Sequence, residues 1–365
     1  MTQPTAKHYR TCNLCEAMCG LEIEHQGDKI LSIKGDKNDV LSRGHICPKA
    51  LALKDLHEDK DRIRQPLKRT ENGWVEVSWA TALQEVAENI GAIQREQGND
   101  AIGLYLGNPV SHNYGALLYL PLLFSALKTK NRYSAAFIDQ MPHQLATKEL
   151  FGSHALMPVP DLDRTDYFLC IGANPMASKG SVMSAGDIVG RLKSIKKRGG
   201  KIVTIDPRFT ETAEISNEHY FTRPGHDAVL LAALIKQVFV NKQQNLRHLH
   251  SSVVNLDRLK ALVDPFSSEV AERFTGIKPA DITRIAADFG AANSAVAYCR
   301  MGSCTSPDGG ITAWLIYCLN IITGNLDRAG GAMFTKPIID LAGSADFVGE
   351  RASFAEHQSR VRGLP

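Results

Sequence analysis

The sequence predicts an α/β protein, in which a small β-rich N-terminal domain is followed by αβα layers with mainly parallel sheets. Apolar residues alternate between Cys19 and Cys47 and are interrupted by Gly-Asp turns, a pattern typical of a small β-meander. Further on, DYFLCIG and KIVTI are short apolar runs separated by a basic helical segment, as expected of buried parallel strands joined by a helix. The length of 365 residues exceeds what one compact core usually holds.

Composition excludes several classes of protein. With 44% hydrophobic and 22% charged residues, the chain has the profile of a globular protein. The net charge is only +3 and the basic residues are scattered, so no basic face for nucleic acid is expected. The apolar stretch 117–127 is too short to span a membrane and contains a proline. Without an apolar leader, we expect a cytoplasmic protein with reduced thiols.

Four cysteines near the N-terminus form a metal-ligand pattern. Three of them lie in one short loop, and the fourth follows after a long interval; they are Cys12, Cys15, Cys19 and Cys47. Structural zinc sites usually combine two separated pairs of ligands. A loop that binds three corners of a cubane, with a remote residue at the last corner, is more typical of a [4Fe–4S] cluster. The cluster is the preferred interpretation, with zinc or purely structural thiols as alternatives.

The remaining cysteines are predicted to be small buried hydrophobic residues. Cys170 and Cys318 lie within apolar runs. Cys299 and Cys304 flank CRMGSC, a spacing that does not predict a ligand pair with a partner nearby. Eight cysteines in all are also too few for a disulfide scaffold.

Polar residues follow both predicted parallel strands. Gly172, Asn174 and Ser178 come after DYFLCIG, and Asp206 and Arg208 come after KIVTI. Open parallel sheets bind nucleotides at the carboxyl ends of their strands. A carboxylate there can accept from ribose hydroxyls or guanine N–H groups, and an arginine can hold a phosphate. The alternative is that the glycine and the aspartate only make turns.

The order of these segments resembles the molybdopterin oxidoreductases of the dimethyl sulfoxide reductase family, which includes formate dehydrogenases, nitrate reductases and polysulfide reductases. The four-cysteine pattern, followed by CPKA and PLKRTENGWVEVSWATAL, resembles the N-terminus of that family. LGNPVSHNYG, DYFLCIGANPMAS, KIVTIDPRFTETA, FTRPGHDAVL and NIITGNLDRAGGAMF then occur in the family's order. The resemblance implies a [4Fe–4S] cluster and a molybdopterin guanine dinucleotide with molybdenum or tungsten.

The resemblance also implies roles for single residues. Lys49 stands where the family places a lysine between cluster and pterin, although a solvated surface lysine is the alternative. Asp227 stands where the family contacts the guanine, although an aspartate at this position can simply cap a helix. The other implied cofactor-binding residues are Gly107, Asn108, His112, Asn113, Pro224, Gly225, Gly302 and Ser303, together with the strand-end residues above.

The resemblance further implies a position for the protein ligand to molybdenum or tungsten. Counting back thirteen residues from Gly152 leads to Asp139, whose carboxylate is a hard ligand suited to a high-valent metal. The alternative is an N-cap for the helix after Pro142. His143 is a candidate for proton transfer or a helix-end residue. The lack of a cysteine here argues against a thiolate- or selenolate-ligated formate dehydrogenase of the usual kind.

Four parts are expected along the chain. They are a [4Fe–4S] domain at 1–62, the first part of an α/β domain at 63–130, a dinucleotide-binding α/β domain at 131–335 and a connection at 336–365. Catalytic subunits of the family run on well beyond this point, so we expect a fragment, a truncated gene product or one part of a split enzyme.

The leading hypothesis for function is a molybdopterin-dependent oxidoreductase. A small-molecule substrate would exchange two electrons at the metal, and electrons would pass through the pterin, Lys49 and the cluster to a partner protein or subunit. The alternative is a non-catalytic electron-transfer or cofactor-binding subunit derived from such an enzyme. An NAD-dependent dehydrogenase is disfavoured, because LGNPVSHNYG and CIGANPMASKG both lack the GxGxxG spacing. The sequence does not identify the substrate.

Overall fold

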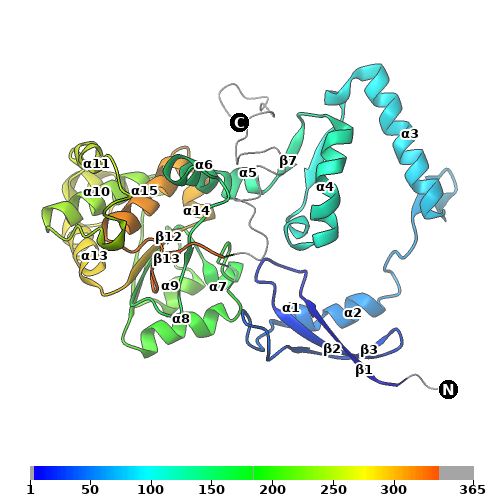
Figure 1. Ribbon diagram of the computed structural model, residues 1–365, viewed down its shortest axis with the longest axis horizontal. Coiled ribbons are helices and arrows are strands. Elements are labelled where there is room, and N and C mark those ends of the chain that lie inside the picture. Colours follow the sequence, from blue (N-terminus) through cyan, green and yellow to red (C-terminus); the bar gives the residue numbers. More distant parts are fainter. Residues whose placement is uncertain (1–3, 184, 337–365) are drawn as a thin grey trace. The chain divides into compact units, whose positions relative to one another are not determined.

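A computed structural model describes residues 4–183 and 185–336 of the chain. Its contacts divide into two compact units that meet in sequence between Ser134 and Ala135 (Figure 1). The predicted connection at 336–365 lies outside the described residues except for its first position. The predicted boundaries after residues 62 and 130 stay predictions.

The first unit begins with a three-stranded antiparallel sheet in the order β1-β2-β3. Between Cys19 and Cys47, where a small meander was predicted, the chain forms the antiparallel hairpin β2–β3, and the third strand of the sheet, β1, precedes Cys12. Helices α1 and α2 pack against β3. The strands of this unit are β1 (Ala6–Thr11), β2 (Gly20–Gln26), β3 (Lys29–Gly35), β4 (Leu67–Thr70), β5 (Gly73–Glu76), β6 (Leu104–Leu106) and β7 (Arg132–Ser134). Its helices are α1 (Pro48–Leu51), α2 (Leu53–Glu58), α3 (Trp79–Gln97), η1 (Asn99–Ala101), η2 (Asn108–His112) and α4 (Tyr114–Leu127).

The rest of the first unit is built from an antiparallel β4–β5 pair, the parallel pair β6–β7 and two long helices. Helix α3 begins at an N-cap, where the Ser78 hydroxyl accepts from the backbone N–H of Thr81. Its Gln94 side chain donates to the carbonyls of Ala126 and Leu127 at the end of α4. Among the helices of the described residues, none combines the length and apolarity that a membrane crossing requires.

The second unit is organised around a four-stranded parallel sheet in the order β11-β10-β9-β12. Its strands are β8 (Val159–Pro160), β9 (Tyr167–Ile171), β10 (Lys201–Ile205), β11 (Glu218–Tyr220), β12 (Ala295–Cys299) and β13 (Ala332–Met333). Its helices are α5 (Ala136–Asp139), α6 (Met141–Phe151), α7 (Pro175–Ser178), α8 (Ile188–Lys197), α9 (Glu211–Ile215), α10 (Asp227–Val240), η3 (Arg247–Leu249), α11 (Leu256–Val263), α12 (Ser268–Thr275), α13 (Pro279–Ala291), α14 (Met301–Cys304) and α15 (Gly309–Ile322).

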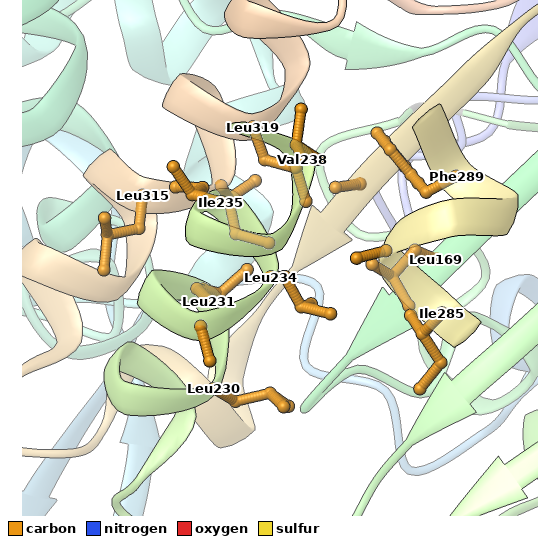
Figure 2. Close-up of a cluster of buried hydrophobic side chains, with 14 of the residues drawn as sticks. Leu169, Leu230, Leu231, Leu234, Ile235, Val238, Ile285, Phe289, Leu315 and Leu319 are labelled. Atoms are coloured by element: carbon orange, nitrogen blue, oxygen red, sulfur yellow. The ribbon is translucent and has the colours of Figure 1, made fainter. Parts of the chain in front are cut away.

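Helices cover both faces of this sheet, which confirms the predicted αβα layers. Because side chains alternate along a strand, Leu169 and Ile171 of β9 face one core while Phe168 and Cys170 face the other. The first core is closed by α10, α13 and α15, as Figure 2 shows for the leucines of α10 beside Phe289. The second core is closed mainly by α8. All these side chains are removed from water, so burial stabilises the sheet from both sides.

The strand–helix–strand unit predicted from DYFLCIG and KIVTI is confirmed, since β9 and β10 pair in parallel and α8 connects them. Helix α8 begins where Gly190 N–H donates to the Asp187 carboxylate. It ends with basic residues in its last turn, and Gly199 follows in the left-handed region with φ +85°.

The chain runs outward from β9 through β10 to β11 and then returns to place β12 on the other side of β9. The strand order therefore reverses between β9 and β12. In open parallel sheets the crevice at such a reversal, beyond the carboxyl ends of the strands, is the usual place for a ligand.

Candidate functional site

The loop that carries the first three cluster cysteines is closed by its own backbone. Cys12 N–H donates to the carbonyl of Cys19 at 2.8 Å, and Met18 N–H donates to the carbonyl of Cys15 at 3.2 Å. Met18 itself lies in the left-handed region with φ +45°, which turns the chain sharply. Cys12 and Cys19 are buried and Cys15 is half-buried. The short spacing thus forms one compact loop, as predicted.

The fourth cysteine returns to this loop through a close approach of two backbone segments. A Cβ atom at Gly35 would lie 2.0 Å from the carbonyl oxygen of Gly44, so only glycine lets the end of β3 meet the segment before Cys47. Cys47 directly precedes α1, and its carbonyl accepts from Ala50 N–H at 3.0 Å.

The four cysteine thiols are electrostatic neighbours. Burial first, and then the charges of the other three thiols, raise the pKa of Cys19 to about 11. A site of four cysteines can hold a cubane, with one cysteine at each iron, or a single zinc ion.

Two of the implied cofactor residues in the first unit have distinctive surroundings. Both ring nitrogens of His112 are buried and lack a hydrogen-bond partner among the described residues, which suits a residue that receives a ligand. Asn113 caps α4, where its side chain accepts from Ala116 N–H at 3.0 Å. Gly107 and Asn108 are exposed at the start of η2, and Lys49 is exposed on α1. The predicted cofactor contacts of these residues stay predictions.

The carboxyl ends of β9 and β12 meet at Gly172 and Gly302. Gly302 N–H donates to the carbonyl of Gly172 at 2.9 Å. Gly172 has φ +56°, and a Cβ atom there would lie 2.3 Å from the Ser303 hydroxyl oxygen. Gly172 therefore does more than make a turn, because its lack of a side chain lets the two strand ends touch at the point of strand reversal.

Asp227 lies at the same edge of the sheet as the first residue of α10. The residue at the N-cap is His226 and no side-chain cap is formed, so the helix-cap alternative for Asp227 is wrong. Its buried carboxylate instead accepts a hydrogen bond from the Ser303 hydroxyl. Burial outweighs that bond and raises the pKa of Asp227 to about 6. The carboxylate can accept further hydrogen bonds besides the one from Ser303. In its apolar surroundings it can therefore bind N–H donors of a ligand.

The end of β10 is held by local hydrogen bonds. Asp206 accepts from Arg208 N–H at 2.9 Å, which agrees with the turn-forming alternative, and burial raises the pKa of its carboxyl. The exposed Arg208 side chain lies 3.4 Å from Glu211. Asn174 donates to Glu211 at 2.7 Å and accepts from Thr212 at the same distance. These contacts fix the edge of the predicted nucleotide site.

The other predicted strand-end residues lie nearer the surface. Ser178 is exposed and accepts from Ser181 N–H at 3.3 Å. Pro224 is exposed, and Gly225 follows with φ +81°, which turns the chain from β11 into α10.

Asp139 is the last residue of α5 and pairs with a buried arginine. Its Oδ2 lies 3.6 Å from Arg300 Nη2, and the Arg300 side chain is only 7% exposed. The N-cap of α6 is Gln140, so the N-cap alternative for Asp139 is wrong. Arg300 is not among the site residues predicted from the sequence. Its position directly after a buried strand was the sequence signal that could have identified it.

His143 lies in the first turn of α6, in agreement with the helix-end alternative, and is buried. Its Nδ1 lies 2.9 Å from the Tyr317 hydroxyl and its Nε2 lies 3.1 Å from the carbonyl of Cys299. Its predicted role in proton transfer stays a prediction.

Two cysteines join His143 in this buried region. The ligand atoms of His143, Cys299 and Cys304 all lie within 4.8 Å of one another. The predicted burial of both cysteines is confirmed, but the prediction that no partner lies near them is wrong, because the partner is 156 residues away from Cys299 in sequence. The hydrogen bond with Cys299 lowers the pKa of the Cys304 thiol to about 5 and raises the pKa of Cys299.

Asp227→Asn is expected to flatten the pH dependence of stability. The folded pKa of about 6 exceeds the unfolded value of about 3.9, so the protein loses about 3 kcal/mol as the pH rises from about 3 to about 7. Below about pH 3 the carboxyl is neutral in both states and this loss is absent. The asparagine variant should therefore be more stable than the wild type near pH 7. Urea unfolding from pH 4 to 7.5 measures the difference, with the exposed Asp257→Asn as control; parallel curves for wild type and Asp227→Asn contradict it.

Comparison with known proteins finds two matching families and several similar proteins. Residues 62–356 match the family described as molybdopterin oxidoreductase, and residues 6–57 match the molybdopterin oxidoreductase Fe4S4 domain. The chain is 27% identical over 322 residues to the F420-dependent formate dehydrogenase subunit alpha of Methanocaldococcus jannaschii, covering 87% of this chain and 46% of that protein. It is 25% identical over 334 residues to a putative formate dehydrogenase of Bacillus subtilis, covering 90% of this chain and 33% of the relative.

A solved structure shares the fold. Acetylene hydratase from Pelobacter acetylenicus superposes with a TM-score of 0.73 at 23% identity, covering 89% of this chain and 44% of that one. The chain thus spans less than half the length of these relatives. The two family matches account for a [4Fe–4S] cluster and a molybdopterin cofactor, in agreement with the cysteine geometry and the strand-reversal edge. Since one of them alone covers most of the sequence, this chain belongs to the molybdopterin oxidoreductase family.

Proposed function

We propose that this chain belongs to an enzyme in which a small-molecule substrate exchanges two electrons at molybdenum or tungsten, with a [4Fe–4S] cluster as the electron relay. The observation that carries the proposal is the four-cysteine site within residues 6–57, which match the molybdopterin oxidoreductase Fe4S4 domain, in a chain that matches the molybdopterin oxidoreductase family. An electron-transfer partner protein or subunit would exchange electrons with the cluster.

Each proposed role follows from the chemistry of the residue. Cys12, Cys15, Cys19 and Cys47 would hold the cluster. Asp227 would accept from guanine N–H groups, since its buried carboxylate has acceptor capacity beyond the bond from Ser303. Arg208, exposed at the end of β10, would hold a phosphate. Lys49 would place a positive charge between cluster and pterin, and the pterin-bound metal, when present, supplies the two-electron chemistry.

Asp139 is the proposed protein ligand to that metal. A carboxylate oxygen suits a hard, high-valent ion. Arg300, at 3.6 Å, pairs with the carboxylate and holds it in one orientation. Formate is the first substrate to assay because the curated relatives are formate dehydrogenases. An oxygen ligand in place of a thiolate or selenolate favours testing oxyanion and sulfur-oxyanion substrates beside it.

Elemental analysis with cofactor extraction on the purified chain tests the proposal. Iron together with molybdenum or tungsten and an extractable pterin dinucleotide is the expected result, and turnover of a substrate would then be assayed. Iron without pterin or molybdenum and tungsten would instead support a non-catalytic electron-transfer subunit.

Asp139→Asn is expected to lower the molybdenum or tungsten content severalfold without changing the iron content, because the amide keeps the shape but loses the anionic ligand. Asp163→Asn is a matched control. Asp163 is 31% exposed and pairs with the half-buried Arg191, much as Asp139 is 30% exposed and pairs with Arg300. Inductively coupled plasma mass spectrometry measures both metals. Equal molybdenum or tungsten loss in the two variants would assign Asp139 a structural role.

A further inference from the structure

Three ligand-type side chains from separate elements converge in the interior of the second unit. His143 comes from α6, Cys299 from the end of β12 and Cys304 from α14. All three are buried, and their ligand atoms lie within 4.8 Å of one another. His143 Nε2 lies 3.7 Å from Cys299 Sγ. Over residues 4–183 and 185–336, this is the one group of three or more histidine, cysteine or acidic side chains gathered so tightly.

We propose that His143, Cys299 and Cys304 form a buried site for a single zinc ion. Two thiolates and one imidazole are a donor set typical of zinc, and a site with three protein ligands keeps a fourth position for water. A cavity of about 20 Å³ is lined by His143 and Cys299. A water molecule needs about 10–15 Å³, so there is room for one water beside two of the three ligands; Cys304 does not line this cavity. Binding releases the thiol protons to solvent.

The surroundings of the histidine suit this role. Tyr317 is buried, and its hydroxyl lies 2.9 Å from His143 Nδ1. In the structure Nε2 also lies 3.1 Å from the carbonyl of Cys299, which can only accept, so zinc would replace the Nε2 proton. A hydroxyl can donate or accept by rotation, so Tyr317 can then accept from Nδ1–H. Histidine ligands to zinc usually have such a partner on the other ring nitrogen, which fixes the orientation of the ring.

The charges also balance around the proposed ion. Two thiolates neutralise one Zn²⁺, and the nearby positive charge of Arg300 is paired with Asp139 at 3.6 Å. A neutral group of this kind avoids the cost of an unpaired charge in the interior. The zinc site uses none of the residues proposed to hold the iron–sulfur cluster or the dinucleotide, so its test is separate from that of the proposed function.

Zinc content of the full chain tests the site. The wild type, with its iron–sulfur cluster in place, is incubated with Zn²⁺ and freed of excess metal before zinc and iron are measured. One zinc per chain is expected in the wild type, and background zinc with unchanged iron is expected in Cys304→Ala. Cys318→Ala is the matched control, because both cysteines are 4% exposed and Cys318 stands outside the group of three. Equal zinc in the wild type and in Cys304→Ala overturns the proposal.

Three further measurements remain decisive if Cys304→Ala does not fold. X-ray absorption at the zinc edge of the wild type should give two sulfur neighbours and a nitrogen; four sulfurs would place the zinc in the N-terminal cysteine loop and overturn the proposal. Tyr317→Phe, which keeps all three ligands, should weaken zinc binding about 10–100-fold. A loss of two hydrogens from the Cys299–Cys304 peptide that persists with zinc present would instead indicate a disulfide and also overturn it.

Discussion

Cys12→Ser is expected to reduce the iron content of the purified chain to a small fraction of the wild-type value. Cys12 is buried in the N-terminal loop, and a serine hydroxyl is a far weaker ligand to iron than a thiolate. Cys47→Ser should have the same effect, because it removes the fourth corner ligand. Iron and acid-labile sulfide are measured together with the visible absorption of the cluster.

The control for this prediction is Cys318→Ser, which places a hydroxyl in a similarly buried position, 4% exposed against 6% for Cys12. Its iron content should match the wild type. A cluster spectrum that survives both Cys12→Ser and Cys47→Ser, with iron unchanged, would refute the assignment. Zinc in place of iron in the wild type would restore the zinc alternative.

Gly172→Ala is expected to destabilise the second unit by about 2–5 kcal/mol. A residue with a Cβ costs about 1–2 kcal/mol in the left-handed region, where Gly172 lies at φ +56°. The new methyl group would also lie 2.3 Å from the Ser303 hydroxyl and 2.7 Å from the Ser303 backbone nitrogen. Overpacking of this kind adds about 1–3 kcal/mol. Urea unfolding gives the change in the free energy of unfolding.

Gly152→Ala separates the two contributions. Gly152 ends α6 in the left-handed region at φ +78°, but a Cβ atom there meets nothing within 4 Å. Its cost should be only about 1–2 kcal/mol. If the two variants were equally destabilised, the close approach between β9 and β12 would contribute nothing. Loss of extractable dinucleotide in Gly172→Ala alone would additionally place the ligand at this junction.

Local sequence patterns predicted those parts of the structure that are formed by residues close together in the sequence. The cysteine loop follows from spacing, and the β2–β3 hairpin follows from alternation between Cys19 and Cys47, whereas the third strand, β1, lies before the cysteines. The parallel pair β9–β10 follows from two apolar runs joined by one helix, because short connections make sequence neighbours into spatial neighbours. The polar edge of the sheet could be predicted for the same reason.

Local sequence patterns could not predict the contacts between distant segments of the chain. The sequence left Asp139 and Asp227 as alternatives between ligand and helix cap, and the tertiary structure decided against both caps by pairing Asp139 with Arg300 and Asp227 with Ser303. Each pair joins residues more than 70 positions apart, so no spacing rule connects them.

The cysteines illustrate the same division. By itself the sequence predicted one loop for Cys12, Cys15 and Cys19, since spacing within a loop is a local property. The approach of Gly35 to Gly44 then returns the segment of the remote Cys47. Only the tertiary structure brought His143 to Cys299 and Cys304, because the packing of α6 against α15 and the return of β12 beside β9 place them in one interior. Side-chain clusters of that kind arise from packing, which depends on all the elements of the unit at once.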